Sequence, residues 1–256
     1  MNSAQHTLQH TPQPPEHWTA FRERREHALA APHGVLAQVA LHWIAPGGGE
    51  QSFDGLPGRW HLGDDGLAGV AAEGEELEIL EGTASGVRRV RVGADIEIEV
   101  IVRGGRTGLR VLDPATPRRT DFTGVPTGPY APDAVLRGSF TARPAEVTVG
   151  SALPWLEQQL PSPGTAQFEI DGETVELVLT GERSLLFTDE TSGTTSADWR
   201  VVEAELEGGT ITVDLNRAVN FPAAFSAWAT CPRPPAGNHL PIAVEAGERR
   251  VARTER

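Results

Sequence analysis

Short alternating runs of apolar residues follow Pro32, and they constrain the fold of this chain more than any other feature. Ile96, Ile98 and Val100 alternate with acidic residues over the segment 95–102, the pattern of a strand with one buried face. Glycine, proline and aspartate separate the runs at intervals typical of antiparallel sandwiches and barrels. The sequence therefore predicts a mainly β protein.

We expect strands in two halves of the chain. In the first half, residues 33–113, the predicted strands are 77–80, 87–92, 95–102 and 109–112, and 35–44 fits either a strand or a helix. In the second half, residues 134–256, the predicted strands are 134–142, 146–149, 168–170, 174–179, 199–206 and 210–215, with a last apolar run at 242–244. Asp171-Gly172 and the glycine-containing triplet 207–209 predict two hairpin turns.

The segment 16–32 has a helical pattern instead. Trp18, Phe21 and Leu29 fall near one helical face, and Pro32 ends the pattern. An aromatic stripe of this kind packs onto a protein core far more often than it binds a ligand. We therefore expect an N-terminal helix followed by two sandwich-like or barrel-like β halves.

Three other segments lack a regular pattern. Residues 1–15 are polar and rich in proline, which predicts a disordered tail. Residues 114–133 hold five prolines and predict a crossing segment between the two halves. Residues 217–241 form a long stretch rich in proline, alanine and asparagine, and long ordered loops are often functional. This last segment is therefore the first place to look for a site.

Composition excludes several classes of protein. The basic residues number 22 and all are arginine, so every mechanism that needs a lysine amine is excluded, including Schiff bases and the phosphate-binding lysine of nucleotide-binding loops. The formal net charge of −13 disfavours nucleic acid and anionic membrane surfaces as partners. No stretch of about 18 apolar residues could span a bilayer.

The sequence also indicates where the protein resides and whether it holds metal. Its first residues contain neither a secretory signal nor a lipidation motif, and its single cysteine fits a reducing compartment, so we expect a cytoplasmic protein. His6 and His10 are four residues apart, a spacing that can bind metal, but in a tail without helical packing solvated histidines are the ordinary case. Cys231 with His239 lacks the close ligand pairs of tight metal sites. We expect no metal site, and the sequence indicates no particular cofactor.

Familiar catalytic signatures are missing, so an enzyme would have to use an unfamiliar arrangement. The chain lacks a G-x-S-x-G elbow, an H-E-x-x-H motif, a C-x-x-C pair and a strand-following G-x-G-x-x-G. Cys231 as nucleophile, His239 as base and Asp214 as orienting carboxylate provide the residue types of a triad. The alternative for Cys231, a lone cysteine before proline, is a small buried apolar residue.

One cluster of polar residues is a candidate ligand site. Asp214 ends a predicted strand, and Asn216, Arg217 and Asn220 follow it closely. An arginine held by an aspartate can bind an anion, with the amides orienting the ligand. Alternatively, these residues anchor the backbone of the long loop.

A second polar stretch has two interpretations as well. Asp189 and Ser192 belong to a run of acidic and hydroxyl residues, 189–192. These side chains can close local hydrogen bonds in a turn. The alternative is that they present an acidic group to Arg217 and so contribute to the candidate ligand site.

Two stretches resemble a known family. The run DLNRAVNFPAAFSAWATCPRPPAGNHLPIAVEAGER and the upstream FTDETSG are similar to the bacterial and archaeal family called domain of unknown function 1684. The resemblance implies no activity. The first half of the family is loosely similar to forkhead-associated sandwiches. This chain does not have the arginine and serine that read phosphopeptides in those sandwiches at a recognisable spacing. Val219, Ala223 and Ala224 stand where members often carry tyrosine and a second cysteine.

Three functions stay open at this point. The first is a binding module for a small anionic ligand or an extended peptide, which uses Arg217, Asn216 and Asn220. The second is a cysteine-dependent or acid/base enzyme that uses Cys231 and His239 with Asp214 or Asp189. The third is a structural or docking protein anchored by tryptophans, which are Trp18, Trp43, Trp155, Trp199 and Trp228.

Overall fold

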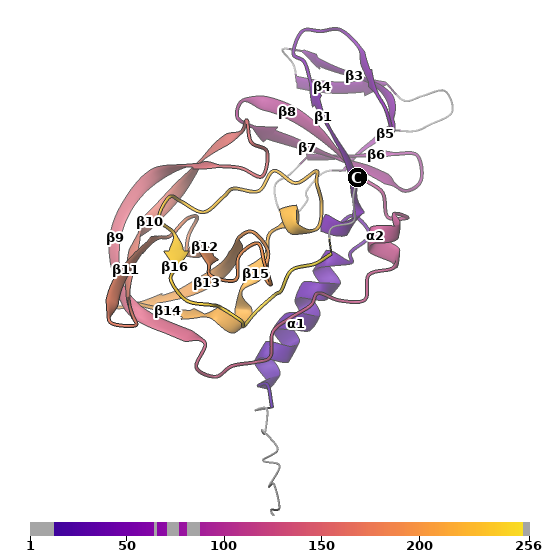
Figure 1. Cartoon of the computed structure of the whole chain (residues 1–256). Helices are drawn as coiled ribbons and strands as arrows, with labels where there is room; N and C mark the ends of the chain where they lie inside the picture. The colour runs from indigo at the N-terminus through magenta and orange to yellow at the C-terminus, as the bar shows by residue number, and fades with distance from the viewer. Residues whose placement is uncertain (1–12, 64–65, 71–76, 81–87, 253–256) are drawn as a thin grey trace, which may run out of the picture.

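The computed structural model describes residues 13–63, 66–70, 77–80 and 88–252, and it is mainly β, as the alternating pattern predicts (Figure 1). The predicted tail histidines, His6 and His10, lie outside these residues. In the described part no helix is long and apolar enough to cross a membrane. The strands of the described residues form one eight-stranded sheet, one five-stranded sheet and one three-stranded sheet.

Helix α1 spans Glu16–Leu29 and runs beside the second half of the chain (Figure 1). The prediction of a helix to residue 32 is wrong at this end, because Pro32 disfavours helical backbone at the residue before it. The buried residues of α1 are Arg22 and Leu29, whereas Trp18 and Phe21 are only partly buried. The helix is therefore held by polar contacts as much as by its aromatic stripe.

The first half contains a short 3-10 turn, η1 (Val35–Ala37), and eight strands: β1 (Gln38–Ile44), β2 (Gln51–Phe53), β3 (Leu56–Gly63), β4 (Gly66–Val70), β5 (Leu77–Leu80), β6 (Arg88–Val92), β7 (Ile96–Arg103) and β8 (Arg106–Leu112). Their order is β1-β8-β7-β6-β5 in one sheet and β2-β3-β4 in the other. The sequence did not predict β2 to β4, which contribute Trp60 and Leu56 to the core of this half. Helix α2 (Pro117–Thr120) lies in the crossing segment.

The second half is a nearly closed barrel of β9 (Val135–Gly150), β10 (Glu157–Ile170), β11 (Glu173–Val178), β12 (Ser184–Asp189), β13 (Arg200–Glu207), β14 (Thr210–Asp214) and β16 (His239–Leu240), with β15 (Val219–Asn220) paired to β13. The 3-10 turns η2 (Leu215–Arg217) and η3 (Pro222–Ala224) follow β14 and β15. Asn238 joins the edges of the barrel, because its Nδ2 donates to the carbonyls of Val178 on β11 and Leu186 on β12, both at 2.8 Å.

Both predicted hairpins are present. Asp171 and Gly172 have positive φ angles of 52° and 84°, as the favoured two-residue turn between β10 and β11 requires. The strands 134–142 and 146–149 are one continuous strand, β9, because a register shift between Ser162 and Gly164 of β10 accommodates Pro144. The run 242–244 is not a strand; the chain instead pairs with β12 earlier, at β16.

The two halves meet where the turn between β7 and β8 faces the start of β10. Trp43 of β1 contacts Trp155 edge-on, with ring centroids 5.2 Å apart, and the guanidinium of Arg106 lies 4.8 Å from the Trp155 ring. Arg110 of β8 donates to the hydroxyl of Thr230 at 3.4 Å. The long segment 217–241 is therefore in contact with both halves.

Candidate functional site

Asn216 uses its side chain to hold the crossing segment. It is 1% exposed, its Nδ2 donates to the carbonyl of Ala131 at 2.8 Å, and its Oδ1 accepts from the Ala131 N–H at 2.8 Å. Asp214 accepts from the backbone N–H of Asn216 at 3.0 Å. The Trp18 indole donates to the Asn216 carbonyl at 3.0 Å. This arrangement matches the anchoring interpretation of the cluster.

Arg217 has a different partner from the one that we predicted. Its guanidinium lies 4.7 Å from the ring centroid of Phe21 on α1, while the Asp214 carboxylate bonds Asn216. Asp189, which we expected to face Arg217, pairs with Arg200 at 2.9 Å. Both expected pairings of Arg217 with a carboxylate are therefore wrong, and its role in ligand binding stays a prediction.

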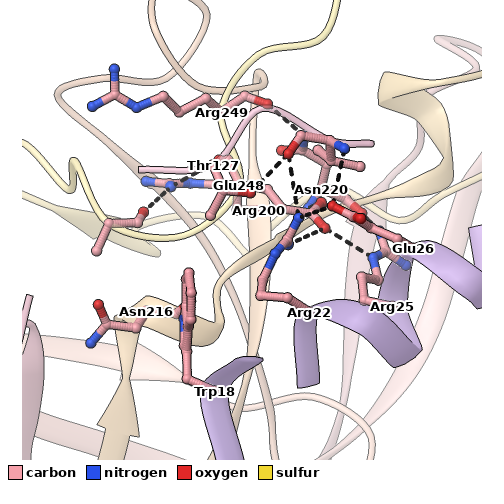
Figure 2. A network of polar contacts seen from close by, with 12 residues as sticks. Trp18, Arg22, Arg25, Glu26, Thr127, Arg200, Asn216, Asn220, Glu248 and Arg249 are labelled. Carbon is pink, nitrogen blue, oxygen red and sulfur yellow. Dashed lines mark hydrogen bonds and ion pairs between the residues drawn. The ribbon is translucent and has the colours of Figure 1, made fainter. Parts of the chain in front are cut away.

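Glu248 is the centre of a polar network that the sequence reasoning missed (Figure 2). Its carboxylate is fully buried and accepts from Arg22 Nη1 and Arg25 Nε, both at 3.0 Å, and from the backbone N–H of Asn220 at 2.7 Å. Asn220 in turn donates to the carbonyl of Arg249 at 2.9 Å. The network joins α1, β15 and the C-terminal segment, and its signal in the sequence is the stretch EAGE, residues 245–248, near the end of the run that resembles the family.

Arg200 on β13 fixes the same C-terminal segment from the other side. It is 1% exposed and donates to the carbonyls of Val244, Ala246 and Glu248 at 2.8, 2.7 and 3.2 Å. Its Nη2 also pairs with Asp189, which accepts from the backbone N–H of residue 191 at 2.8 Å. Ser192 accepts from the Asp189 N–H at 2.9 Å, so this stretch is a hydrogen-bonded turn.

The three candidate triad residues make separate contacts. Cys231 is buried in a cluster with Trp199 and Ala229, and burial raises the pKa of its thiol to about 11. His239 is half-exposed and contacts Thr188 Oγ1 at 3.0 Å and Glu190 at 3.1 Å. Asp214 bonds Asn216. The structure therefore does not join them into a triad, and neither His239 nor Asp214 contacts the thiol.

We expect Cys231 to react slowly with iodoacetamide while the protein is folded. Its pKa rises from 9.0 to about 11, so at a common pH below both values the folded chain holds roughly a hundredfold less thiolate than the unfolded chain. Alkylation followed by intact-mass spectrometry, with and without denaturant, measures the ratio. Native alkylation as fast as alkylation of the unfolded chain would contradict burial of this thiol.

The same shift predicts a pH dependence of stability. Between pH 9.0 and about 11 the folded state holds the thiol proton that the unfolded state has lost, so the free energy of unfolding falls as pH rises through this window. Cys231→Ala should remove the part of the decrease in the free energy of unfolding that comes from this thiol. Urea unfolding measures the free energy of unfolding of wild type and the variant at several pH values in this window. If the two plots of free energy against pH are parallel, another group causes the decrease.

A pocket of about 820 Å³ lies beside the segment 221–233. Its walls are mainly apolar and aromatic, and the lining residues that the argument uses are Trp199, Phe221, Phe225, Ala227, Arg233 and Arg250. The indole N–H of Trp199 is buried and has no hydrogen-bond partner among the described residues, which is unusual for a buried donor. None of the five predicted ligand residues lines this pocket, which are Asn216, Arg217, Asn220, Asp189 and Ser192.

The arginines of the pocket are positioned by backbone carbonyls. Arg233 donates from Nε to the Ser151 carbonyl at 3.0 Å, and its guanidinium lies 4.8 Å from the Trp199 ring centroid. Arg250 donates from Nη1 to the Gly193 carbonyl at 2.7 Å. Neither has an ion pair with a carboxylate in the described part of the chain. Both can therefore offer charge to a ligand.

Among the described residues there is no group of three or more histidine, cysteine or acidic side chains that could hold a metal ion. The sequence reasoning selected the segment 217–241 and missed the pocket itself. The sequence predicts Trp199 as a strand residue or a docking anchor and not as a ligand-binding residue. Arg233 and Arg250 have no sequence neighbours that mark them as site residues. The residues 221–229 do carry a signal for a pocket, because their alanines leave space and their aromatic side chains can form a flat wall.

Comparisons with known proteins give a family and no activity. A family model described as a protein of unknown function, DUF1684, matches residues 120–249. The solution NMR structure of an uncharacterized protein from Haloarcula marismortui is 29% identical, with a TM-score of 0.43 and coverage of 54% of this chain and 82% of that chain. No curated protein matches the chain significantly.

Proposed function

Because the chain belongs to the DUF1684 family, whose description assigns no activity, we propose its function from its geometry: it is a β module that binds a small organic ligand in the pocket beside residues 221–233. The observation that carries the proposal is the pocket itself. Its volume of about 820 Å³ falls in the range of about 300–1,000 Å³ that is usual for small-molecule sites.

The lining supports a ligand with an apolar body and an anionic group. Phe221 and Phe225 are partly exposed and offer aromatic surface, and the Trp199 ring, which is 6% exposed, lies beside Phe221 with the ring centroids 6.3 Å apart. Arg233 and Arg250 offer positive charge in a chain whose net charge is −13. An apolar pocket with a few convergent polar groups is the usual form of a binding site.

A docking function is the second candidate, and exposed Trp155 is the observation that favours it. This side chain is 49% exposed at the junction of the two halves, where it contacts Trp43 and Arg106. Exposed aromatic residues are enriched among the anchors of protein interfaces. A cytoplasmic location is also our proposal, supported by the single cysteine.

The pocket is tested by filling it. Ala227 lines the pocket and is exposed, so Ala227→Trp should place an indole in the ligand space without disturbing the core. We expect saturable binding of the fluorescent dye 8-anilinonaphthalene-1-sulfonate to wild type and at least about tenfold weaker binding to the variant. The free energy of unfolding should change by at most about 0.5 kcal/mol.

Ala145→Trp is the matched control for that experiment. Ala145 is an exposed alanine of β9 outside the pocket, so its replacement should leave dye binding unchanged. Equal dye binding by wild type and Ala227→Trp would place the dye elsewhere and contradict the proposed site. Native mass spectrometry of gently purified protein provides a second readout, because a retained mass would identify the natural ligand directly.

A further inference from the structure

The guanidinium of Arg233 is preorganised to bind a planar anion. One face lies on the Trp199 ring, Nε is used by the Ser151 carbonyl, and the backbone N–H of Arg233 donates to Gly150 at 2.8 Å. Its two terminal nitrogens have no partner among the described residues. These two nitrogens form the fork that binds a carboxylate with two parallel hydrogen bonds. Three contacts therefore fix the arginine, and its recognition edge is available.

The formal charge of the pocket limits the charge of its ligand. Arg233 and Arg250 contribute two positive charges and Asp198 one negative charge, which leaves a net charge of +1 among the lining residues. A monoanion neutralises this charge. Because these three side chains are exposed, a dianion such as a phosphate monoester would leave an excess negative charge at the surface of a chain that already carries −13, and that repulsion disfavours it.

The shape of the apolar wall limits the ligand further. Trp199, which carries Arg233 on its ring, is also 6.3 Å from Phe221 between ring centroids, so the charged group and the aromatic surface adjoin each other. A flat aromatic body can pack on this surface while an attached carboxylate reaches the arginine.

Resting on the proposed function, we infer that the ligand of this pocket is a planar aromatic monocarboxylate. Its ring system packs on the aromatic wall, and its carboxylate binds the terminal nitrogens of Arg233. Arg250 contributes a second positive charge from the C-terminal segment. The inference thus names a ligand class and a principal recognition residue for the site.

Three matched probes test the inference by isothermal titration calorimetry: 2-naphthoate, the uncharged 2-naphthamide and the dianionic 2-naphthyl phosphate. We expect 2-naphthoate to bind tightest and 2-naphthamide about tenfold to a hundredfold more weakly, as for loss of a charged hydrogen-bonded pair. The phosphate should bind no more tightly than the carboxylate. Binding of 2-naphthoate that is no tighter than either other probe would overturn the ligand class.

The residue assignment is tested with two methionine variants. Arg233→Met keeps an unbranched apolar stem over Trp199 and removes the fork, so 2-naphthoate should lose about tenfold or more in affinity while 2-naphthamide loses little. Arg217→Met removes a comparable guanidinium that lies on Phe21, and it should leave both affinities unchanged. A larger effect of Arg217→Met would return the site to the sequence-predicted cluster and overturn the role of Arg233.

The outcomes separate this inference from the proposed function. If all three probes bind equally and Ala227→Trp weakens them all, the pocket is a ligand site whose ligands are not selected by charge, so only the inference fails. If no probe shows saturable binding and the dye also fails to bind, the inference and the proposed function fail together.

Discussion

Glu248→Ala is expected to destabilise the protein by about 3–5 kcal/mol, a loss typical of breaking a buried ion pair. The carboxylate is fully buried between Arg22 and Arg25 of α1 and the backbone of Asn220. Its removal leaves those cations without their principal partner. For a chain of this size the melting temperature should fall by roughly 6–20 °C, and urea unfolding provides the free energy.

The variant should also loosen α1 before the barrel unfolds. Hydrogen exchange would then rise in α1 more than in β9 and β10, because the network joins the helix to the C-terminal segment. Glu245→Ala is the matched control, since Glu245 pairs with Arg249 in the same segment but is 56% exposed and should cost less than about 1 kcal/mol. Equal losses in the two variants would refute a structural role specific to Glu248.

Local rules were sufficient for the parts of the fold that depend on local chemistry. The Asp171-Gly172 hairpin and the start of α1 follow from turn preferences and from a proline before the first helical turn. The prediction failed where tertiary pairing overrides a local signal. The sequence predicts two strands, 134–142 and 146–149, on either side of Pro144, but the register shift between β9 and β10 allows β9 to continue.

Strand β12 illustrates a second kind of failure. Its residues, 184–189, were not among the predicted strands, and its last residue belongs to the polar run 189–192, which we interpreted first as a turn. The barrel buries Leu185 and Phe187 on one side and Leu186 on the other, so no alternation is present to indicate a strand. A strand buried on both faces cannot be distinguished from other apolar runs by its period alone.

The candidate site was harder to predict than the fold because its parts are far apart in the sequence. Trp199, Phe221, Arg233 and Arg250 meet only after the barrel closes and the C-terminal segment returns across it. Sequence spacing favoured Arg217, which lies next to polar neighbours, over Arg233, which lies between prolines. The long irregular segment was the useful signal, and only three-dimensional contacts distinguish its anchors from its pocket residues.

The buried pair of Arg200 and Asp189 should have a comparable effect, because it fixes the segment that brings Arg250 to the pocket. Arg200→Met removes the bonds to the carbonyls of Val244, Ala246 and Glu248 and leaves Asp189 without its cation. We expect a loss of about 3–5 kcal/mol in the free energy of unfolding. Hydrogen exchange should rise first in residues 242–250.

A double-mutant cycle separates the charge pair from the backbone contacts. Asp189→Asn alone should also destabilise the protein, and the double variant should lose less than the sum of the single losses by about 1–3 kcal/mol, because either change already breaks the pair. Arg183→Met is the control, since Arg183, just before β12, pairs with Glu203 of β13, but the two side chains are 58% and 57% exposed. Strict additivity would show that Arg200 acts through the carbonyls alone. In that case the hydrogen bonds from Arg200 to the backbone carbonyls would hold the C-terminal wall of the pocket, and the charge of Asp189 would add nothing to its stability.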